Sequence, residues 1–357
     1  YLVYEKKVYP SSILAVTFTN KAVSVMKERV NDLLQETKPQ ESKSGGINLP
    51  WLGTFHSICV KMLRQKSDGK LVKRDFIIYD ENDVLRAVKK AMGEVGISPK
   101  DYNPRAIRSF ISGAKSELLS AKQYQDYALD PMQRVTGKVF LKYEKILNNS
   151  NALDFDDLII KTVKILQSDK VFKDYFASKF KYILVDEYQD TNHAQYMFLK
   201  ILAKKHNNIF VIGDDWQSIY SFRGAKFKNI LDFKKDYAGA KVIYLEENYR
   251  STTPILESAQ AVIKKNETRS DKHLFTSKSG GAPVSLVVAD SKEDEIGFII
   301  DEIDSLSRGE GKGLKDFVVL YRTNAQSRAF EELLVHRKVP YRIYGGLRFY
   351  ERKEIKD

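Results

Sequence analysis

The sequence predicts an α/β protein built around a parallel β-sheet. Four short runs rich in β-branched and other apolar residues occur at positions 13–18, 182–185, 209–212 and 242–245. Each run ends in polar residues, and helical patterns lie between the runs. The 43% apolar fraction of the 357 residues can supply cores for two or three domains. Because ligands bind outside the carboxyl ends of parallel strands, we expect the residues just after each run to carry the function.

A covering helix is expected directly after the first strand. Its apolar residues recur at spacings of three to four with charged residues between them, at Ala22, Met26, Val30 and Leu33. This is the period of an amphipathic helix that lays one face on a sheet.

An inserted helical domain is expected between residues 80 and 150, where the strand signal disappears. Charged amphipathic patterns replace it, with helix N-caps at Asp80 and at Asn103 before Pro104. The polar residues 38–46 are expected to form a surface loop.

A second α/β unit is expected after the polar turn at residues 277–283. Apolar runs at 284–288 and 317–320 flank a helical pattern at 293–306, which gives the order strand, helix, strand. We expect the 357 residues to contain the beginning of this unit but not its end.

The charge of the chain favours an anionic partner. Fifty-nine Lys and Arg residues against 47 Asp and Glu give a net charge of +12, which points to nucleic acid first and a membrane surface second. The alternative is that the lysines only maintain solubility.

The single cysteine, Cys59, is expected in the core, and the five histidines lack metal-ligand spacing. Without a run of 18 apolar residues or a signal segment, we expect no membrane partner and a cytoplasmic location.

The strongest chemical signal is the segment YILVDEYQDT at residues 182–191. Its strand runs directly into Asp186 and Glu187, which places two carboxylates at the ligand edge of the sheet. One carboxylate can hold Mg²⁺, usually through water, while the other accepts a proton from an attacking water. We therefore predict Asp186 as a metal ligand and Glu187 as a general base. The alternative is an acidic pair that caps a helix.

The next strand ends in GDDWQ, where Gln217 can hydrogen-bond a γ-phosphate or its attacking water without adding charge. Tyr220 and Phe222 alternate with small or polar residues before Arg223. This pattern is typical of base-stacking platforms beside a phosphate contact, with core packing as the alternative.

The run at 242–245 leads into Tyr249 and Arg250. A guanidinium stabilises charge on a transferring phosphoryl group better than a lysine does, so Arg250 is a candidate arginine finger supplied in cis. A structural salt bridge is the alternative for Arg250. Tyr249 is expected either to cover a nucleotide base or to pack.

Eight segments of this chain resemble, in order and spacing, the motifs of the UvrD, PcrA and Rep group of superfamily 1 helicases. They are TFTNKA, GTFHS, LDFDDL, VDEYQDTN, GDDWQSIYSFRGA, LEENYRST, VLYRTNAQSR and GGLRFYERKEIKD. The resemblance covers essentially the whole chain. It implies two RecA-like P-loop NTPase domains that bind ATP and Mg²⁺ between them and move 3′ to 5′ along single-stranded DNA, acting at junctions with duplex DNA in repair or replication.

The resemblance also implies domain boundaries and residue roles. The first RecA-like domain takes residues 1–79 and 151–247, the helical insertion 80–150, and the first part of the second RecA-like domain 248–357. Asp186 and Glu187 match the family's metal and base positions, Gln217 its γ-phosphate sensor and Arg250 its first arginine finger, while Tyr249 matches a position near the adenine. The positions that match DNA contacts are Phe18, Thr19, Asn20, Thr54, Phe55, His56, Tyr220, Phe222, Arg223, Arg322 and Asn324.

The chain departs from the family pattern at several positions. Asp215 and Trp216 precede Gln217 where relatives usually carry an acidic or small residue and then an acidic residue or Pro, and Phe222 stands where Trp is frequent. No G-x-x-x-x-G-K-[ST] phosphate loop occurs, and the glycines at 345 and 346 do not replace it. We therefore expect a fragment that does not hydrolyse ATP alone.

Two other functions remain open from the sequence. One is a helicase–nuclease, whose nuclease domain would follow this chain. The other is a DNA-binding relative that has lost ATP hydrolysis. Retention of Asp186, Glu187, Gln217 and Arg250 together argues against the second.

Overall fold

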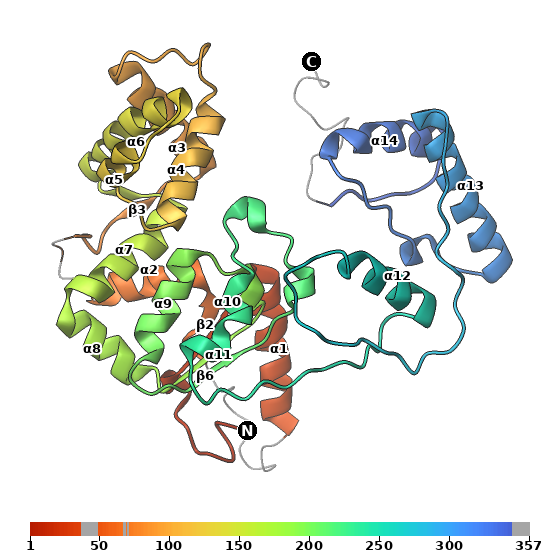
Figure 1. Cartoon of the computed structure of the whole chain (residues 1–357), viewed down its shortest axis with the longest axis horizontal. Helices are drawn as coiled ribbons and strands as arrows, with labels where there is room; N and C mark the ends of the chain where they lie inside the picture. The colour runs from red at the N-terminus through yellow and green to blue at the C-terminus, as the bar shows by residue number, and fades with distance from the viewer. Residues whose placement is uncertain (37–48, 67–68, 70, 345–357) are drawn as a thin grey trace. The chain divides into compact units, whose positions relative to one another are not determined.

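A computed structural model of the chain describes residues 1–36, 49–66, 69 and 71–344 (Figure 1). These residues divide into two compact units. Unit 1 comprises the described residues of Tyr1–Glu246 and Ile263–His273, and unit 2 comprises Glu247–Val262 and the described residues from Leu274 onward. The loop expected at 38–46 and the glycines at 345 and 346 lie outside the described residues.

Unit 1 contains a four-stranded, fully parallel sheet with the strand order β2-β1-β5-β6. Its strands are β1 (Ile13–Thr17), β2 (Leu52–Thr54), β5 (Tyr182–Val185) and β6 (Ile209–Val211). The α/β class with a parallel sheet is thus confirmed, and three of the predicted apolar runs are strands. Leu14 and Val16 of β1 are both buried, as expected for a central strand of a parallel sheet.

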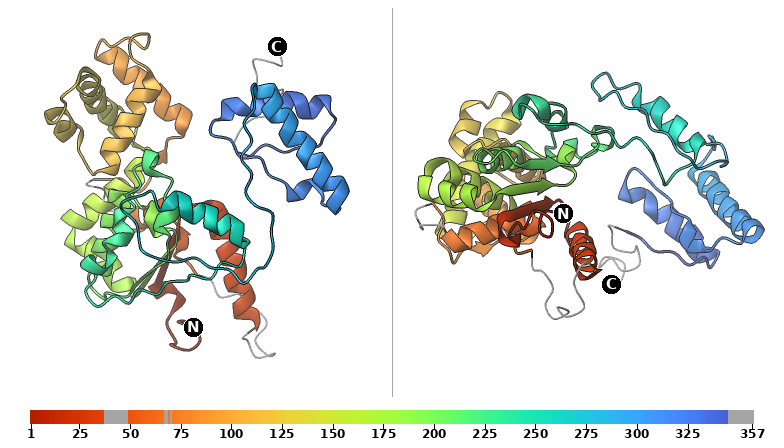
Figure 2. Two further views of the ribbon diagram at one scale, coloured as in Figure 1. Left: turned by 45° about the vertical axis from the view of Figure 1, so that its right-hand side comes forward. Right: turned by 90° about the horizontal axis from the view of Figure 1, so that it is seen from below.

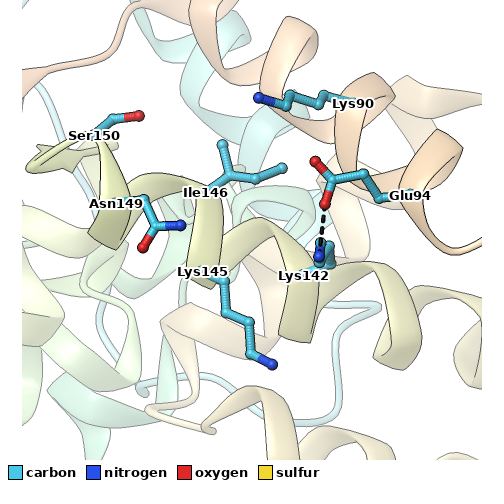
Figure 3. A pocket seen from close by; sticks show the side chains of 7 residues that line it. All are labelled: Lys90, Glu94, Lys142, Lys145, Ile146, Asn149 and Ser150. Atoms are coloured by element: carbon cyan, nitrogen blue, oxygen red, sulfur yellow. Dashed lines mark ion pairs between the residues drawn. The ribbon is translucent and has the colours of Figure 1, made fainter.

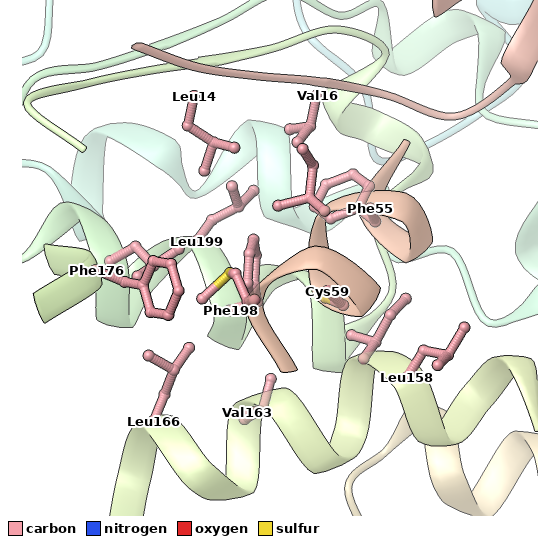
Figure 4. Close-up of a cluster of buried hydrophobic side chains, with 14 of the residues drawn as sticks. Leu14, Val16, Phe55, Cys59, Leu158, Val163, Leu166, Phe176, Phe198 and Leu199 are labelled. Atoms are coloured by element: carbon pink, nitrogen blue, oxygen red, sulfur yellow. The ribbon is translucent and has the colours of Figure 1, made fainter. Parts of the chain in front are cut away.

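One hydrophobic core joins the sheet to its helices (Figure 4). The helices are α2 (Phe55–Lys66), α7 (Phe155–Ser168), α8 (Lys170–Lys179) and α9 (His193–Ala203). Cys59 lies among them, fully buried, and burial raises the pKa of its thiol to about 12. The prediction of a core cysteine is confirmed, and the thiol is kept in its unreactive protonated form.

The covering helix predicted after the first strand is α1 (Asn20–Glu36). It packs against β1 and β2. Val23 is buried, whereas Leu33 lies exposed toward the far end. The helix therefore covers the sheet mainly with its first turns.

A helical bundle occupies the interval where helices were predicted. It consists of α3 (Glu81–Glu94), α4 (Pro104–Ser116), α5 (Ala121–Asp126) and α6 (Pro131–Asn149) (Figure 2). Both predicted N-caps are confirmed: Asp80 accepts from the Asp83 N–H at 2.8 Å and Asn103 accepts from the Arg105 N–H at 2.9 Å. The bundle has its own core, in which the side chains of Val88, Met92, Ile107 and Phe140 are fully buried.

The chain enters and leaves the bundle through two short strands that pair with each other. β3 (Ile77–Ile78) precedes α3, β4 (Ala152–Leu153) follows α6, and the two run parallel. Their pairing holds the entry and the exit of the bundle together.

A buried ion-pair network lies where the bundle meets α7. Lys115 of α4 contacts Asp154 at 2.6 Å and Asp157 at 2.9 Å, and the Tyr143 hydroxyl of α6 donates to Asp154 at 2.7 Å. Burial by itself would lower the pKa of Lys115, but the two aspartates outweigh it and raise that pKa. The ammonium is therefore charged and fully paired, as a buried charge must be.

Unit 2 contains α12 (Thr253–Ile263, whose last residue belongs to unit 1), α13 (Lys292–Glu310) and α14 (Ser327–His336). The helix predicted at 293–306 is α13, and Ser291 caps it by accepting from the Asp294 N–H at 3.1 Å. Across the ranges described for both units, no helix is both long and apolar enough to cross a membrane.

The strands predicted at 242–245, 284–288 and 317–320 are wrong for this structure. These runs form no regular strand, and the isolated bridge in this part of the described chain joins Glu247 and Phe275. Leu245, Leu286 and Leu320 are 85–90% exposed. A parallel strand needs at least one paired strand and is normally covered on both faces, and these runs have neither in the structure.

The buried network makes a testable contribution to stability. In Lys115→Met, Asp154 and Asp157 stay buried without their cation, so we expect the free energy of unfolding to fall by about 3–5 kcal/mol. Urea denaturation followed by circular dichroism measures this value. The control Lys122→Met removes an exposed cation of α5 and should change it by less than about 0.5 kcal/mol. Equal effects of the two variants would contradict the assignment.

Candidate functional site

The carboxyl ends of β1 and β5 bring Thr17 and Asp186 together. The Asp186 N–H donates to the Val16 carbonyl at 3.0 Å, which continues the ladder between the two strands. The buried Thr17 hydroxyl donates to Asp186 Oδ2 at 3.4 Å. The first predicted carboxylate is thus held at the sheet edge by backbone and side chain.

The electrostatics of Asp186 fit a bound cation. Its pKa is raised, first by burial and second by the neighbouring charge of Glu187. A divalent cation would compensate both effects. In the described ranges, no group of three or more His, Cys, Asp or Glu side chains is placed to hold a metal ion. Mg²⁺, however, commonly needs only one or two carboxylate ligands because it keeps several waters. Asp186 with its neighbour suits that requirement.

Glu187 has a left-handed backbone conformation, with φ 52° and ψ 44°. For a residue other than glycine this costs about 1–2 kcal/mol, and such strain concentrates at functional sites. Glu187 is the second residue after β5, and its side chain is exposed. Its Oε2 accepts a hydrogen bond from Gln189 Nε2 at 2.8 Å.

Gln189 connects the ends of β5 and β6. Its side chain is buried, and its Oε1 accepts from the Asp214 N–H at 2.9 Å. A Cβ at Gly213 would lie 2.5 Å from that same oxygen. Only glycine at position 213 permits this approach.

Gln217 lies on the loop that follows β6. Its Nε2 donates to Asp214 Oδ2 at 2.7 Å. Glu187, Gln189, Asp214 and Gln217 therefore form one continuous hydrogen-bonded line. The structure brings the predicted base and the predicted sensor into a single network, although no direct bond joins them among the contacts described.

Comparison with known proteins identifies the family. The family model of the UvrD/REP helicase N-terminal domain matches residues 1–238, and that of the UvrD-like helicase C-terminal domain matches residues 243–357. The chain belongs to the UvrD-like helicase family.

Three similar relatives carry the name ATP-dependent DNA helicase PcrA. The protein of Bacillus subtilis strain 168 is 44% identical over the whole chain, which covers 47% of that relative. The proteins of Staphylococcus aureus strain Mu50 and Staphylococcus epidermidis strain ATCC 35984 are 43% identical over the whole chain, which covers 48% of each. The chain spans about half the length of these relatives.

In this UvrD-like chain, the aromatic pair predicted to stack on bases is exposed. Phe222 is 76% exposed and Tyr220 is partly so, with ring centroids 6.0 Å apart. Exposure on this scale excludes simple core packing for Phe222 and favours the base-stacking interpretation. The side chain of Arg223 lies outside the described part of the structure.

Phe55 corrects one of the predicted DNA contacts. Its ring is only 1% exposed and packs edge-on against Phe18 and Phe198, at centroid distances of 5.5 and 6.2 Å. It is the first residue of α2 and belongs to the hydrophobic core of unit 1, so its ring offers no face to a base. Phe18 is itself only half-buried.

The other predicted DNA contacts of unit 1 are polar. Thr19 and Asn20 are exposed at the start of α1, where the Thr19 hydroxyl oxygen accepts from the Ala22 N–H at 3.1 Å. Thr54 is buried, and its hydroxyl oxygen accepts from the Ser57 N–H at 3.3 Å.

His56 is partly buried beside Phe155, with ring centroids 5.7 Å apart. Burial lowers the pKa of His56. The imidazole is therefore neutral near pH 7 and can contact DNA by hydrogen bonding but not by charge.

The remaining predicted site residues belong to unit 2 and are exposed. The side-chain oxygen of Asn248 accepts from the N–H of Arg250 at 3.0 Å and from that of Ser251 at 2.7 Å, which shapes the turn. The Tyr249 hydroxyl donates to Glu247 at 2.7 Å. Arg322 and Asn324 lie just before α14.

A hollow of about 160 Å³ lies on the helical bundle and not at the sheet edge (Figure 3). An ion pair of 2.7 Å joins Lys142 and Glu94 across it. None of the predicted catalytic residues lines this hollow. Its lining residues are Lys90, Glu94, Lys142, Lys145, Ile146, Asn149 and Ser150.

Three residues of the site were not predicted from the sequence, namely Thr17, Gln189 and Asp190. Gln189 and Asp190 lie inside the segment at 182–191, so an amide and an acid next to the predicted base were the available signal. Asp190 has a buried carboxylate oxygen without a hydrogen-bond partner in the structure.

Asp190 supplies a pH-dependent prediction. Its pKa is raised to about 6, first by burial and second by Glu187, from an unfolded value of about 3.9. Its protonated form therefore favours the folded chain below about pH 4, and this contribution is lost as pH rises through about 6. In Glu187→Gln the Asp190 pKa should fall but stay above its ordinary value, as followed by ¹³C NMR of the carboxyl carbon. An unchanged pKa, or an equal change in the exposed control Glu28→Gln, would contradict the coupling.

Proposed function

We propose that this chain contributes the central part of an ATP-dependent DNA helicase that moves 3′ to 5′ along single-stranded DNA. Family membership supports ATP and DNA as substrates. Under this proposal residues 1–79 and 151–247 form one RecA-like domain, residues 80–150 its helical insertion, and residues 248–357 part of a second. Junctions of single- and double-stranded DNA in repair or replication are the proposed sites of action.

The proposed chemistry is attack of water on the γ-phosphorus of ATP. Glu187 accepts the proton of that water while the bond to the bridging oxygen breaks and ADP leaves. Gln217 would bond the γ-phosphate or the attacking water. Mg²⁺, when bound through Asp186, would neutralise charge on the phosphates.

Arg250 and Tyr249 are the residues of unit 2 proposed to act on the nucleotide. A guanidinium can donate two parallel hydrogen bonds to a transferring phosphoryl group, and an exposed tyrosine ring can cover an adenine. Both side chains are exposed, which suits groups that act on a ligand.

The conformation of Glu187 carries the proposal. A left-handed carboxylate residue two positions after a parallel strand, hydrogen-bonded to a buried glutamine, is a strained arrangement. The alternative role of Glu187 as a helix cap does not explain this conformation. The Glu187 side chain makes no capping hydrogen bond to the 3₁₀ turn that follows, η3 (Tyr188–Asp190). The strained conformation is explained if the Glu187 carboxylate must be held at a fixed position relative to the attacking water.

The exposed polar and aromatic side chains support a DNA-contacting surface. Phe222 and Tyr220 offer ring faces, while Thr19 and Asn20 offer hydrogen-bonding groups, and the partly buried His56 can add another. Stacking is independent of sequence because every base has a π-face. Such a surface suits a motor that steps along DNA of any sequence.

The base assignment is tested by Glu187→Gln in the whole protein in which these 357 residues occur. We expect kcat for DNA-stimulated ATP hydrolysis to fall about 10²- to 10⁴-fold, since the amide cannot accept the proton, while ATP affinity is kept. Steady-state kinetics and equilibrium nucleotide binding measure the two quantities. Glu28→Gln, an exposed change on α1, is the control. Undiminished turnover in Glu187→Gln would contradict the assignment of Glu187 as the general base.

The stacking surface is tested by Tyr220→Ala and Phe222→Ala. Each should weaken binding of single-stranded DNA by about 1–3 kcal/mol, with little dependence on base sequence. Fluorescence anisotropy of labelled oligonucleotides measures the affinity at fixed salt. Tyr127→Ala removes an exposed ring that follows α5 and should leave the affinity unchanged. If it weakens binding equally, the two aromatic residues have no special part in DNA contact.

A further inference from the structure

A segment of unit 1 interrupts unit 2 along the chain. Unit 2 includes residues 247–262 and resumes at residue 274, whereas the intervening Ile263–His273 belongs to unit 1. The segment is therefore joined in sequence to unit 2 at both of its ends. The contacts below show what holds it in unit 1.

Ser270 fixes the segment to the loop after β6. Its N–H and its hydroxyl both donate to the Asp215 carboxylate, each at 2.6 Å. Its carbonyl accepts from the indole Nε1 of Trp216 at 3.2 Å. Three hydrogen bonds thus join one residue of the segment to two neighbouring residues of the loop.

Lys272 adds charge to the same contact. Its Nζ bonds to Asp214 Oδ1 and lies 3.2 Å from Asp215 Oδ1. The ammonium also lies over the Trp216 ring, 4.7 Å from the centroid. The side chains of Lys272 and Asp215 are only 10% and 6% exposed, so these attractions are weakly screened by solvent.

Asp214 connects Lys272 to the proposed catalytic residues through hydrogen bonds. One carboxylate oxygen binds Lys272, and the other accepts from Gln217 at 2.7 Å. The Asp214 N–H donates to Gln189, which in turn donates to Glu187. A line of hydrogen bonds therefore runs from Lys272 to both the proposed sensor and the proposed base.

We propose that Lys272 is a positioning residue for ATP hydrolysis, which neutralises Asp214 and Asp215 and thereby holds Gln217 in place through segment 263–273. The inference rests on the proposed function and deepens it. Without the ammonium, two adjacent carboxylates repel each other in a half-buried loop, and Asp214 loses the bond that fixes its orientation toward Gln217.

The kinetic test compares Lys272→Met, Lys272→Arg and Lys264→Met in the whole protein with saturating single-stranded DNA. Lys272→Met should lower kcat about 10-fold or more with KM for ATP changed less than about threefold, because orientation and not nucleotide binding is lost. Lys272→Arg keeps the charge and should retain most of kcat. Lys264→Met removes an exposed lysine of the same segment and should behave as wild type.

Several outcomes would overturn the proposal. They are an unchanged kcat in Lys272→Met, an increase in KM alone, or failure of Lys272→Arg to restore turnover. If Lys272→Met does not fold, Ser270→Ala decides the question: loss of one hydroxyl donor to Asp215 should lower kcat about threefold at constant KM, and an unchanged kcat overturns the proposal. If wild type hydrolyses no ATP with DNA, the proposed function fails independently.

A second measurement tests the contact without any activity. The chain has two tryptophans, and Trp51 is only 2% exposed, so quenching by neutral acrylamide reports on Trp216. Opening of the contact in Lys272→Met should raise the quenching constant about twofold, while Lys272→Arg and Lys264→Met stay near wild type. Unchanged quenching in Lys272→Met would show that Lys272 does not hold the loop, whatever the kinetics.

Discussion

The parallel direction of four strands is the constraint on which the candidate site depends. Since β1, β5 and β6 run the same way as neighbours, their carboxyl ends share one edge, where Thr17 meets Asp186 and Gln189 reaches Asp214. These residues come from three distant stretches of sequence. Only the pairing of the strands places these residues within hydrogen-bond distance of one another. The topology of the sheet therefore determines which side chains meet at the site.

The helical bundle is attached to this framework by charge and not by apolar packing alone. Lys115 with Asp154 and Asp157 forms a fully paired buried network beside the paired strands β3 and β4. Such a network adds little net stability compared with apolar residues of the same shape, but it tolerates few alternative arrangements. We infer that it fixes the register of the bundle on α7.

The site itself lowers the stability of the free chain. Glu187 has a left-handed backbone, the pKa values of Asp186 and Asp190 are raised by burial and by a like charge, and a carboxylate oxygen of Asp190 is buried without a partner. Each feature opposes folding when no ligand is bound. A bound cation would relieve the repulsion, so the cost of the arrangement falls when ligand is present. The surrounding core supplies the rigidity that keeps these groups in place.

The sequence by itself determined the class of fold, three strands of the sheet, the capped helices and the candidate residues Asp186, Glu187 and Gln217. It could do so because strand periodicity, helix caps and the residues after a strand are local features, readable without the rest of the chain. The runs at 242–245, 284–288 and 317–320 show the limit, since a strand exists only with a partner strand. Tertiary structure alone decided that Phe55 is a core ring and Phe222 a surface ring. It also decided that Gln189 connects Glu187 to Asp214, and that Lys272 reaches Asp214 across 58 positions of sequence. Burial and long-range contact depend on where distant segments meet, which no local pattern encodes.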